Sequence, residues 1–320
     1  MGEGSLIRLG TRGSPLALLQ TALVEASLAD AGHRTERCTL RTTGDVIRDV
    51  PLEQIGTTAI FTRELDDALL QGRIDAAVHS LKDLPTRLPD GITVAAVGPR
   101  ENPADVFVSS RYQWEEVPIG ASVATSSVRR RAELLRARPD LDVVSIRGNI
   151  DTRLEILQAT PSLAGTVLAA AGLIRLGLQD RISHYFPPEV LLPAPGQGAI
   201  AVTVRRDDEQ AMAAVRCFHD RRAAAAVGAE RALLGALDGG CQVPVGALAD
   251  AQPAGDRWRV ELHARVVSLD GRRVVDATDS ATIDTTESAT SLGQRLADRM
   301  RGLGADEILR DVRAFPSKDG

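Results

Sequence analysis

Cys241 lies in the segment Asp238-Gly239-Gly240-Cys241-Gln242-Val243-Pro244, which suits neither a helix nor a strand. The two glycines permit backbone angles that other residues avoid, and they leave space beside the sulfur. A thiol presented in this way can be a nucleophile or the attachment point of a covalently bound group. The alternative is a buried structural cysteine in a turn, because free cysteines usually behave as small hydrophobic residues. The segment alone leaves both interpretations open.

Arginines recur where a predicted strand ends and a helix begins, at Arg12, Arg129, Arg130, Arg147, Arg153 and Arg175. Ligands of open α/β sheets bind at the carboxyl ends of the strands, where helix N-termini also favour anions. A cation in the first turn opposes the helix dipole, so these positions favour a ligand with several negative groups. Guanidinium groups match carboxylates in a bidentate way. A single arginine of this kind could be a solvated surface charge, but six in equivalent positions weaken that alternative.

Lys82 and Asp83 follow the predicted strand Ala76–His79. A carboxylate at a strand end can transfer protons or stabilise a developing cation, or it can simply cap a helix. His79 either titrates near neutrality or is a half-buried, hydrogen-bonded residue. The sequence has no His or Cys spacing typical of zinc, no phosphate-binding P-loop and no GxGxxG pattern. It therefore predicts neither a metal site nor a nucleotide site.

The composition excludes several classes of protein. The chain has 320 residues, of which 43% are hydrophobic and 25% charged, and its net charge of −5 argues against a general nucleic-acid binder. No apolar run approaches the roughly 18 residues of a membrane span, so no membrane association is expected. The N-terminus shows no secretory signal, and three cysteines cannot all pair within the chain. We therefore expect a cytoplasmic protein.

Alternating strand and helix patterns predict an α/β fold with mostly parallel sheets. Ser14 and Pro15 begin a helix after the strand Ile7–Gly10, and Gly32 ends it. The other elements expected in the first unit are strands at 35–41, 76–79 and 94–97, a loop at 43–59 and a helix at 62–71.

A second similar unit follows, and then a different one. The second is expected to have strands at 106–108, 123–125, 143–146 and 167–170. Its expected helices are one at 127–137, one that begins at Asp151 as its cap, and a short one that ends at Leu176. The strand at 200–204 is expected to return to the first unit. The last unit is expected to have helices at 208–218, 221–237 and 287–303, and strands at 245–249, 258–268 and 273–279, with a hairpin turn at 269–272.

Seven ordered motifs together resemble the porphobilinogen deaminase family. They are Arg12-Gly13-Ser14-Pro15-Leu16-Ala17, Val78-His79-Ser80-Leu81-Lys82-Asp83-Leu84-Pro85, Thr125-Ser126-Ser127-Val128-Arg129-Arg130, Arg147-Gly148-Asn149-Ile150-Asp151-Thr152-Arg153, Ala169-Ala170-Ala171-Gly172-Leu173-Ile174-Arg175, Pro195-Gly196-Gln197-Gly198 and Gly240-Cys241. Each motif alone is weak, but their order and spacing match from residue 6 to about residue 305.

The resemblance implies two α/β domains similar to type II periplasmic binding proteins, plus a small C-terminal α+β domain with a three-stranded antiparallel sheet. The implied boundaries are 1–100 with 196–217 for domain 1, 101–195 for domain 2 and 218–320 for domain 3. Domain 3 would carry Cys241.

The resemblance also implies an activity, that of hydroxymethylbilane synthase. Members of the family carry a dipyrromethane cofactor on the cysteine through a thioether, one per chain. They add four porphobilinogen units head to tail with loss of ammonia, and water then releases hydroxymethylbilane. The alternative is a non-catalytic anion-binding or sensor protein on the same two-lobed scaffold.

The resemblance assigns roles to residues of this sequence. Asp83 would stabilise the cationic azafulvene formed from the substrate, and Lys82 would pair with cofactor carboxylates. Cys241 would hold the cofactor. The cofactor and substrate would be bound by the arginines given above together with Ser14, Thr125, Ser126, Ser127 and Gln197. A monomer is implied, and a transient contact with the next enzyme of the pathway is compatible with it.

One segment departs from the family pattern. The family usually has Gly-Lys-Gly-x-Phe before the helix near residue 62, whereas this chain has Gly56-Thr57-Thr58-Ala59-Ile60-Phe61. Thr58 therefore stands where a lysine is usual, and one cation of the site is absent at that position.

Overall fold

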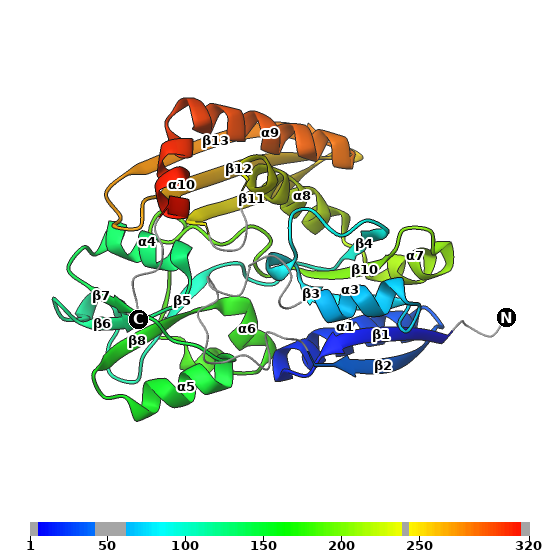
Figure 1. Ribbon diagram of the computed structural model, residues 1–320, viewed down its shortest axis with the longest axis horizontal. Helices are drawn as coiled ribbons and strands as arrows, with labels where there is room; N and C mark the ends of the chain where they lie inside the picture. The colour runs from blue at the N-terminus through cyan, green and yellow to red at the C-terminus, as the bar shows by residue number, and fades with distance from the viewer. Residues whose placement is uncertain (1–5, 42–61, 239–242, 315–320) are drawn as a thin grey trace. The chain divides into compact units, whose positions relative to one another are not determined.

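The computed structural model of this chain describes residues 6–41, 62–238 and 243–314 (Figure 1). The chain divides into two compact units, which are described separately below. Unit 1 consists of residues 1–101 and 198–224, and unit 2 consists of residues 102–197 and 225–320. Thr58, Cys241 and the loop predicted at 43–59 lie outside the described residues.

Unit 1 is built on a five-stranded sheet. Its strands are β1 (Leu6–Arg12), β2 (Arg34–Leu40), β3 (Ala76–Ser80), β4 (Ile92–Val97) and β10 (Ile200–Arg205). The strand order is β2-β1-β3-β10-β4, in which β1 pairs in parallel with β2 and β3. The chain leaves the sheet after β4 and returns as β10, which runs antiparallel between β3 and β4. The predicted return of the strand at 200–204 is therefore confirmed.

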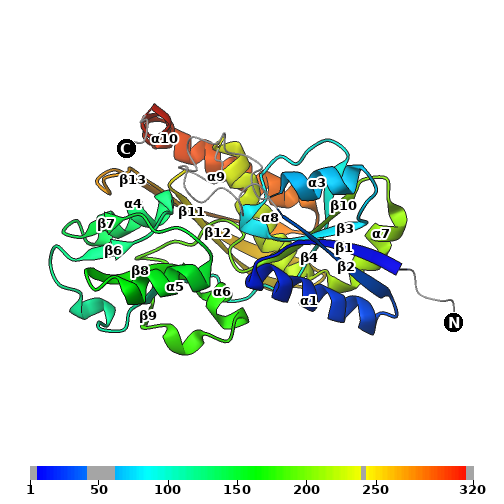
Figure 2. The ribbon, with the colours of Figure 1, turned by 60° about the horizontal axis from the view of Figure 1, so that its bottom comes forward.

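The helices within the described residues of unit 1 are α1 (Pro15–Asp30), α3 (Arg63–Leu70) and α7 (Glu209–Val215). The start of α1 is the predicted one, because the Ser14 hydroxyl accepts a hydrogen bond from the Ala17 amide at 3.3 Å. Gly32, with φ +85°, follows its end. The buried face of α1, with Val24 and Leu28, packs on the sheet (Figure 2).

Unit 2 contains a second five-stranded sheet with the same pattern. Its strands are β5 (Asp105–Val108), β6 (Ser122–Ala124), β7 (Asp142–Val144), β8 (Leu163–Ala169) and β9 (His184–Tyr185). The order is β7-β6-β8-β5-β9, with β6 parallel to β7 and β8, and β5 antiparallel to both of its neighbours. Each sheet thus has one reversed strand in the fourth position. The predicted mostly parallel α/β architecture is confirmed.

Three helices connect these strands: α4 (Val128–Ala137), α5 (Ile150–Ala159) and α6 (Ala170–Arg175). Ser127 caps α4, and α5 and α6 pack against β8 (Figure 2). The prediction that Asp151 caps α5 is wrong, because the cap is Asn149 and Asp151 lies in the first turn. Gly148, with φ +100°, turns the chain one residue before that cap. An acidic side chain in the first turn still complements the helix dipole.

The rest of unit 2 is a three-stranded antiparallel sheet with helices. The strands are β11 (Val245–Ala254), β12 (Arg257–Val267) and β13 (Val274–Ile283), and the helices are α8 (Arg221–Ala236), which begins at the end of unit 1, α9 (Thr286–Gly302) and α10 (Ala305–Ala314). Apolar residues of α8, α9, α10 and one face of the sheet share a core (Figure 1). The C-terminal α+β part is as predicted except for the helix predicted at 208–218, which lies in unit 1 as α7, where it packs on β4 and β10. The helix α10 and the short strand β9 were not predicted.

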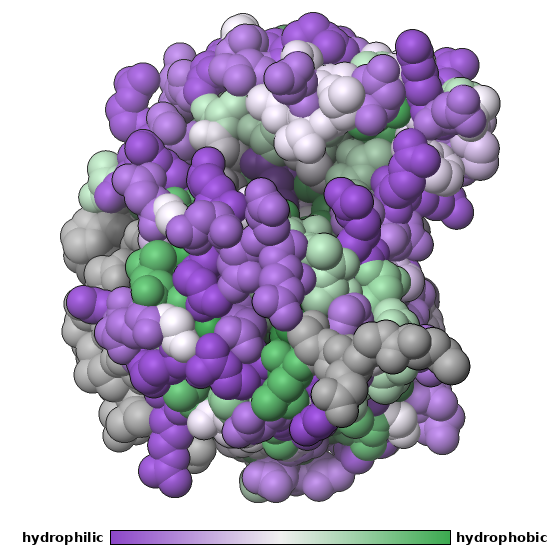
Figure 3. All heavy atoms as spheres, turned by 90° about the vertical axis from the view of Figure 1, so that its right-hand side faces the viewer, coloured by the Kyte–Doolittle hydropathy of each residue, from purple (hydrophilic) through white to green (hydrophobic). Residues whose placement is uncertain are grey.

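Hydrophilic side chains predominate on the face shown in Figure 3, with apolar side chains among them. Among the described residues, no helix is long and apolar enough to cross a membrane.

Candidate active site

The carboxyl ends of β1 and β3 carry the predicted site residues of unit 1. Arg12 is the last residue of β1, and Ser14 caps α1 immediately afterwards. Lys82 and Asp83 form, with Leu81, the short 3₁₀ helix η2 (Leu81–Asp83) that follows β3. Because β1 and β3 are parallel neighbours, their ends meet at one edge of the sheet. Asp83 is half-buried there and is not a helix N-cap.

His79 lies at the same edge but does not titrate near neutrality. Burial lowers the pKa of His79 to about 3, and the positive charge of Arg12 contributes in the same direction. Its Nε2 atom is 3.1 Å from the Thr203 hydroxyl. His79 is therefore a neutral, hydrogen-bonded residue, which is the second of the two alternatives considered from the sequence.

Gln20 fixes the end of β3 and was not predicted. Its Nε2 atom donates to the Ser80 hydroxyl at 2.8 Å, and that hydroxyl is 3.1 Å from Gln20 Oε1. Only 3% of Gln20 is exposed. A polar residue on the buried face of α1 was the available signal, because buried amides need partners. Gln20 thus anchors the strand that leads into Lys82 and Asp83.

The predicted hydroxyl residues of unit 2 shape the start of α4. The Ser127 hydroxyl accepts a hydrogen bond from the Arg130 amide at 3.4 Å, and the Thr125 hydroxyl accepts one from the Ser127 amide at 3.2 Å. Ser126 contacts the Ile146 carbonyl and accepts a hydrogen bond from the Ile146 amide at 3.1 Å. These bonds hold the end of β6 against the segment that leads into Arg147.

Arg129 and Arg130 converge on Asp105, a residue that sequence reasoning missed. Arg129 Nη1 is 2.6 Å from Asp105 Oδ2, and Arg130 Nη2 is 2.8 Å from Oδ1. Gln197 donates to the same Oδ1 at 3.0 Å. Asp105 is fully buried, and the arginines are 4% and 6% exposed. We call these four residues the Asp105 cluster.

The charges of the Asp105 cluster are not balanced. Burial alone would raise the pKa of Asp105, but the charges of Arg129 and Arg130 and the hydrogen bonds from Arg129 and Gln197 hold it well below its usual range. Asp105 is therefore ionised at physiological pH. Two guanidinium groups face one carboxylate, so the cluster keeps an excess of positive charge. The ion pairs give both arginines a structural role, and their predicted role in binding stays a prediction.

Arg147 and Arg153 lie beyond the carboxyl end of β7, at the same edge of the sheet as the start of α4. Arg147 follows β7, and Arg153 Nε donates to the Gly148 carbonyl at 2.9 Å. Arg175 is the last residue of α6. A Cβ at Gly148 would lie 2.7 Å from Thr152 Cβ, so this turn requires glycine.

Glu230 is a second buried acid that the sequence did not single out. It is fully buried in α8, and its carboxylate accepts hydrogen bonds from the Gly196 and Ala249 amides, both at 2.7 Å. It therefore ties the turn next to Gln197 to the strand β11.

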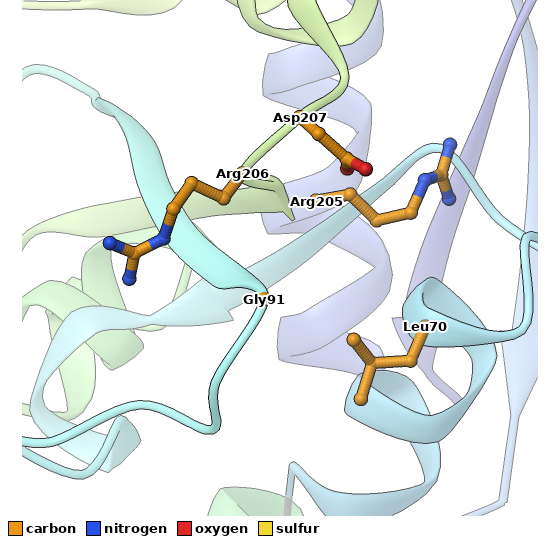
Figure 4. A pocket seen from close by; sticks show the side chains of 5 residues that line it. All are labelled: Leu70, Gly91, Arg205, Arg206 and Asp207. Atoms are coloured by element: carbon orange, nitrogen blue, oxygen red, sulfur yellow. The ribbon is translucent and has the colours of Figure 1, made fainter.

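A surface cavity of about 390 Å³ lies away from the predicted residues (Figure 4). It is lined by Leu70, Gly91, Arg205, Arg206 and Asp207. Arg205 pairs with Ile92 across the sheet, so this is the edge opposite the carboxyl ends of the parallel strands. The side chains of Arg205 and Arg206 extend in opposite directions and do not converge on one ligand.

The two sheets define the class of protein. Their shared strand order, with one reversed strand in each, places the chain among the α/β proteins. The solved structures that the chain partly resembles include the methionine binding protein MetQ, which is 14% identical, with a TM-score of 0.42 over 68% of this chain and 91% of that chain. Another is a nutrient binding protein from Burkholderia cenocepacia bound to methionine, 13% identical, with a TM-score of 0.42 over 68% of this chain and 93% of that chain.

The sequence comparisons define the family. Residues 7–213 match "Porphobilinogen deaminase, dipyromethane cofactor binding domain", and residues 224–302 match "Porphobilinogen deaminase, C-terminal domain". Porphobilinogen deaminase of Desulforudis audaxviator is 48% identical over 309 residues, which cover 96% of this chain and 97% of that protein. The protein of the same name from Rubrobacter xylanophilus is 49% identical over 307 residues, covering 95% and 97%. This chain belongs to the porphobilinogen deaminase family.

Proposed function

We propose that this protein is a hydroxymethylbilane synthase. It joins four porphobilinogen molecules head to tail, releases ammonia from each and frees the linear tetrapyrrole hydroxymethylbilane with water. The observation that carries the proposal is the match of residues 7–213 to a dipyromethane cofactor binding domain, in a chain that also has Cys241 and Asp83. A non-catalytic anion-binding protein or sensor needs neither residue, so that alternative is not favoured.

The residues fit the dipyrromethane group that the family implies. Pyrrole units of this pathway carry acetate and propionate side chains, so the group is polyanionic. The Asp105 cluster keeps an excess of positive charge, and it lies beside the hydroxyls that shape the start of α4. When bound, the dipyrromethane supplies the pyrrole carbon to which the first substrate unit is joined. Cys241 would hold it through a thioether.

Different residues of the chain bind the carboxylates and stabilise the cation. Carboxylates are bound and oriented by the arginines together with Ser14, Thr125, Ser126, Ser127 and Gln197. Lys82 pairs with carboxylates of the cofactor. The Asp83 carboxylate accepts a hydrogen bond from the pyrrole N–H and stabilises the cation that remains when the substrate loses ammonia. Its place directly after β3 supports this role, because the Gln20–Ser80 hydrogen bonds hold that strand end in a fixed position.

The domain boundaries 1–100 with 196–217, 101–195 and 218–320 belong to the same proposal. A separate apolar core under β11, β12 and β13 supports a third domain. The protein is proposed to act as a monomer in the cytoplasm, with a transient contact to the next enzyme of the pathway.

The first test is the intact mass of the purified protein under denaturing conditions, beside a Cys241→Ser control. We expect a mass excess of two linked pyrrole units that is absent from the control, and porphobilinogen consumption by the wild type alone. A bare polypeptide that gains no mass after addition of porphobilinogen, and does not consume it, would contradict the proposal.

The role of Asp83 is tested by Asp83→Ala, with the exposed Asp90→Ala as the matched control. Loss of one preorganised electrostatic partner typically costs roughly 10²–10³ in rate. We expect such a fall in turnover with the covalent mass unchanged, and a wild-type rate for Asp90→Ala. Turnover of Asp83→Ala within about threefold of the wild type would exclude the assigned role.

A further inference from the structure

The three-stranded sheet of unit 2 has one apolar and one charged face. Val260, Leu262, Ala264 and Val266 of β12 lie in the core shared with α8 and α9. Because side chains alternate along a strand, Arg265 points to the opposite face. Arg265 is nevertheless only 5% exposed, so something other than solvent covers it.

Glu133 of α4 is the partner of Arg265. Arg265 Nη1 lies 3.3 Å from Glu133 Oε2, and Glu133 is 1% exposed. The same nitrogen donates to the Pro188 carbonyl at 3.1 Å, and Nε donates to Asp276 on β13. One guanidinium thus joins α4, the segment before Leu191 and two strands of the sheet.

Arg136 completes this group from the helix side. Its Nε donates to Glu133 Oε2 at 2.9 Å, and its Nη2 donates to the Glu189 and Val190 carbonyls at 2.6 and 2.8 Å. We call Glu133, Arg136, Arg265 and Asp276 the α4 clamp.

The β12–β13 turn touches the same part of α4 through an independent contact. Gly271 has φ +76°, and a Cβ there would lie 2.4 Å from the Arg136 amide nitrogen and 2.5 Å from the Leu135 carbonyl carbon. Backbone therefore lies directly on backbone. The C-terminal half of α4 is held both by charge and by close packing.

The N-terminal end of α4 carries Arg129 and Arg130 of the Asp105 cluster. Val128–Ala137 is a single helix, so a shift at its C-terminal end also displaces Arg129 and Arg130. A misplacement of about 1 Å in a binding site can cost roughly 10²-fold in catalytic efficiency. The clamp is therefore in a position to affect binding without touching the ligand.

We propose that the buried Arg265–Glu133 ion pair fixes the position of α4 against the three-stranded sheet, which makes Arg265 a positioning residue for the carboxylate-binding arginines at the start of the helix. The consequence for catalysis rests on the function proposed above. A buried ion pair often adds little net stability compared with an apolar pair of similar size, but it penalises arrangements in which its charges are separated. The ion pair therefore favours a single arrangement of α4 on the three-stranded sheet.

The test compares the wild type with Arg265→Met, the double variant Glu133→Met/Arg265→Met and the control Arg259→Met. Arg259 lies on the same face of β12 but is exposed. The measurements are thermal unfolding, kcat and KM for porphobilinogen, and hydrogen exchange of the α4 amides. KM does not depend on the fraction of folded enzyme, so a partly unfolded variant remains informative.

We expect Arg265→Met to lower Tm by about 10 °C, because it leaves Glu133 buried without this partner. KM should rise about tenfold or more while kcat changes less, because the displaced arginines bind carboxylates and do not react. The double variant should recover most of the Tm but keep the raised KM and the faster exchange in α4. Arg259→Met should match the wild type in every measurement.

A wild-type KM and wild-type exchange in Arg265→Met would overturn the proposal. So would a double variant whose KM returns to normal together with its Tm, because the pair would then act through stability alone. If the wild type itself does not consume porphobilinogen, the proposed function fails. In that case the exchange of the α4 amides still decides whether the clamp positions the helix.

Discussion

Asp105 in unit 2 and Asp66 in unit 1 are both almost fully buried, yet their pKa values are shifted in opposite directions. Burial alone would raise the pKa of Asp105, but the charges of Arg129 and Arg130 and the hydrogen bonds it accepts hold it well below its usual range. Burial raises the pKa of Asp66 to about 6, and the charge of Asp67 adds to that effect. The partners, and not the depth of burial, decide whether a buried carboxylate is charged.

The surroundings of Asp66 explain the contrast. Its carboxylate oxygens make no well-aligned hydrogen bond with any residue in the described part of the chain. The Thr62 hydroxyl is near enough to lower the pKa of Asp66, but burial outweighs it. Asp105, by comparison, accepts hydrogen bonds from two arginines and Gln197. The two sheets share one topology, and the charged residues placed on it give each unit a different electrostatic character.

The largest expected effect comes from Asp105→Asn, which removes the negative charge between two buried guanidinium groups. Leaving buried charges without a partner costs about 3–5 kcal/mol in the free energy of unfolding. Urea unfolding at pH 7 measures this, with Asp180→Asn as an exposed control in the same unit, expected within about 0.5 kcal/mol of the wild type. If the free energy of unfolding of Asp105→Asn falls by less than about 1 kcal/mol, the cluster is solvated or rearranges.

The pH dependence sharpens this test. The folded pKa of Asp105 lies below the unfolded value of about 4, so the stabilisation is complete above that pH and is lost as the pH falls through the folded pKa. The difference in unfolding free energy between the wild type and Asp105→Asn should therefore be constant from about pH 5 to 8 and narrow below about pH 4. A difference that narrows on the alkaline side would assign the effect to another group.

A smaller effect of the opposite sign is expected for Asp66→Asn. The folded pKa of Asp66 is raised to about 6, so its contribution to stability is complete below the unfolded pKa and is lost as the pH rises through 6. An asparagine does not ionise, so the variant should be more stable than the wild type at pH 8 by about 1–3 kcal/mol. Urea unfolding at pH 4 and pH 8 measures the difference, with Asp90→Asn as the exposed control. Equal stability of Asp66→Asn and the wild type at pH 8 would contradict the pKa shift.

Most elements could be predicted from local signals, but not all of them. Ser14 and Pro15 gave the start of α1, because a capping hydroxyl and a fixed φ act within one turn. The cap of α5 was misplaced by the same kind of reasoning, since Asp151 and Asn149 are both good capping residues. The helix α10 was missed although Asp306, Glu307 and Arg313 place charges at its ends in the order that suits the helix dipole.

The sequence by itself determined the motifs, the family resemblance and the alternation of strands and helices, because those depend on residue type and on spacing over a few turns. Only the tertiary structure decided that Asp105 pairs with both Arg129 and Arg130, and that Arg265 lies against Glu133. Partners 24 to 132 residues apart in the chain leave no local pattern. They meet because β5 enters the sheet antiparallel beside β8, and because the three-stranded sheet presents its charged face to α4.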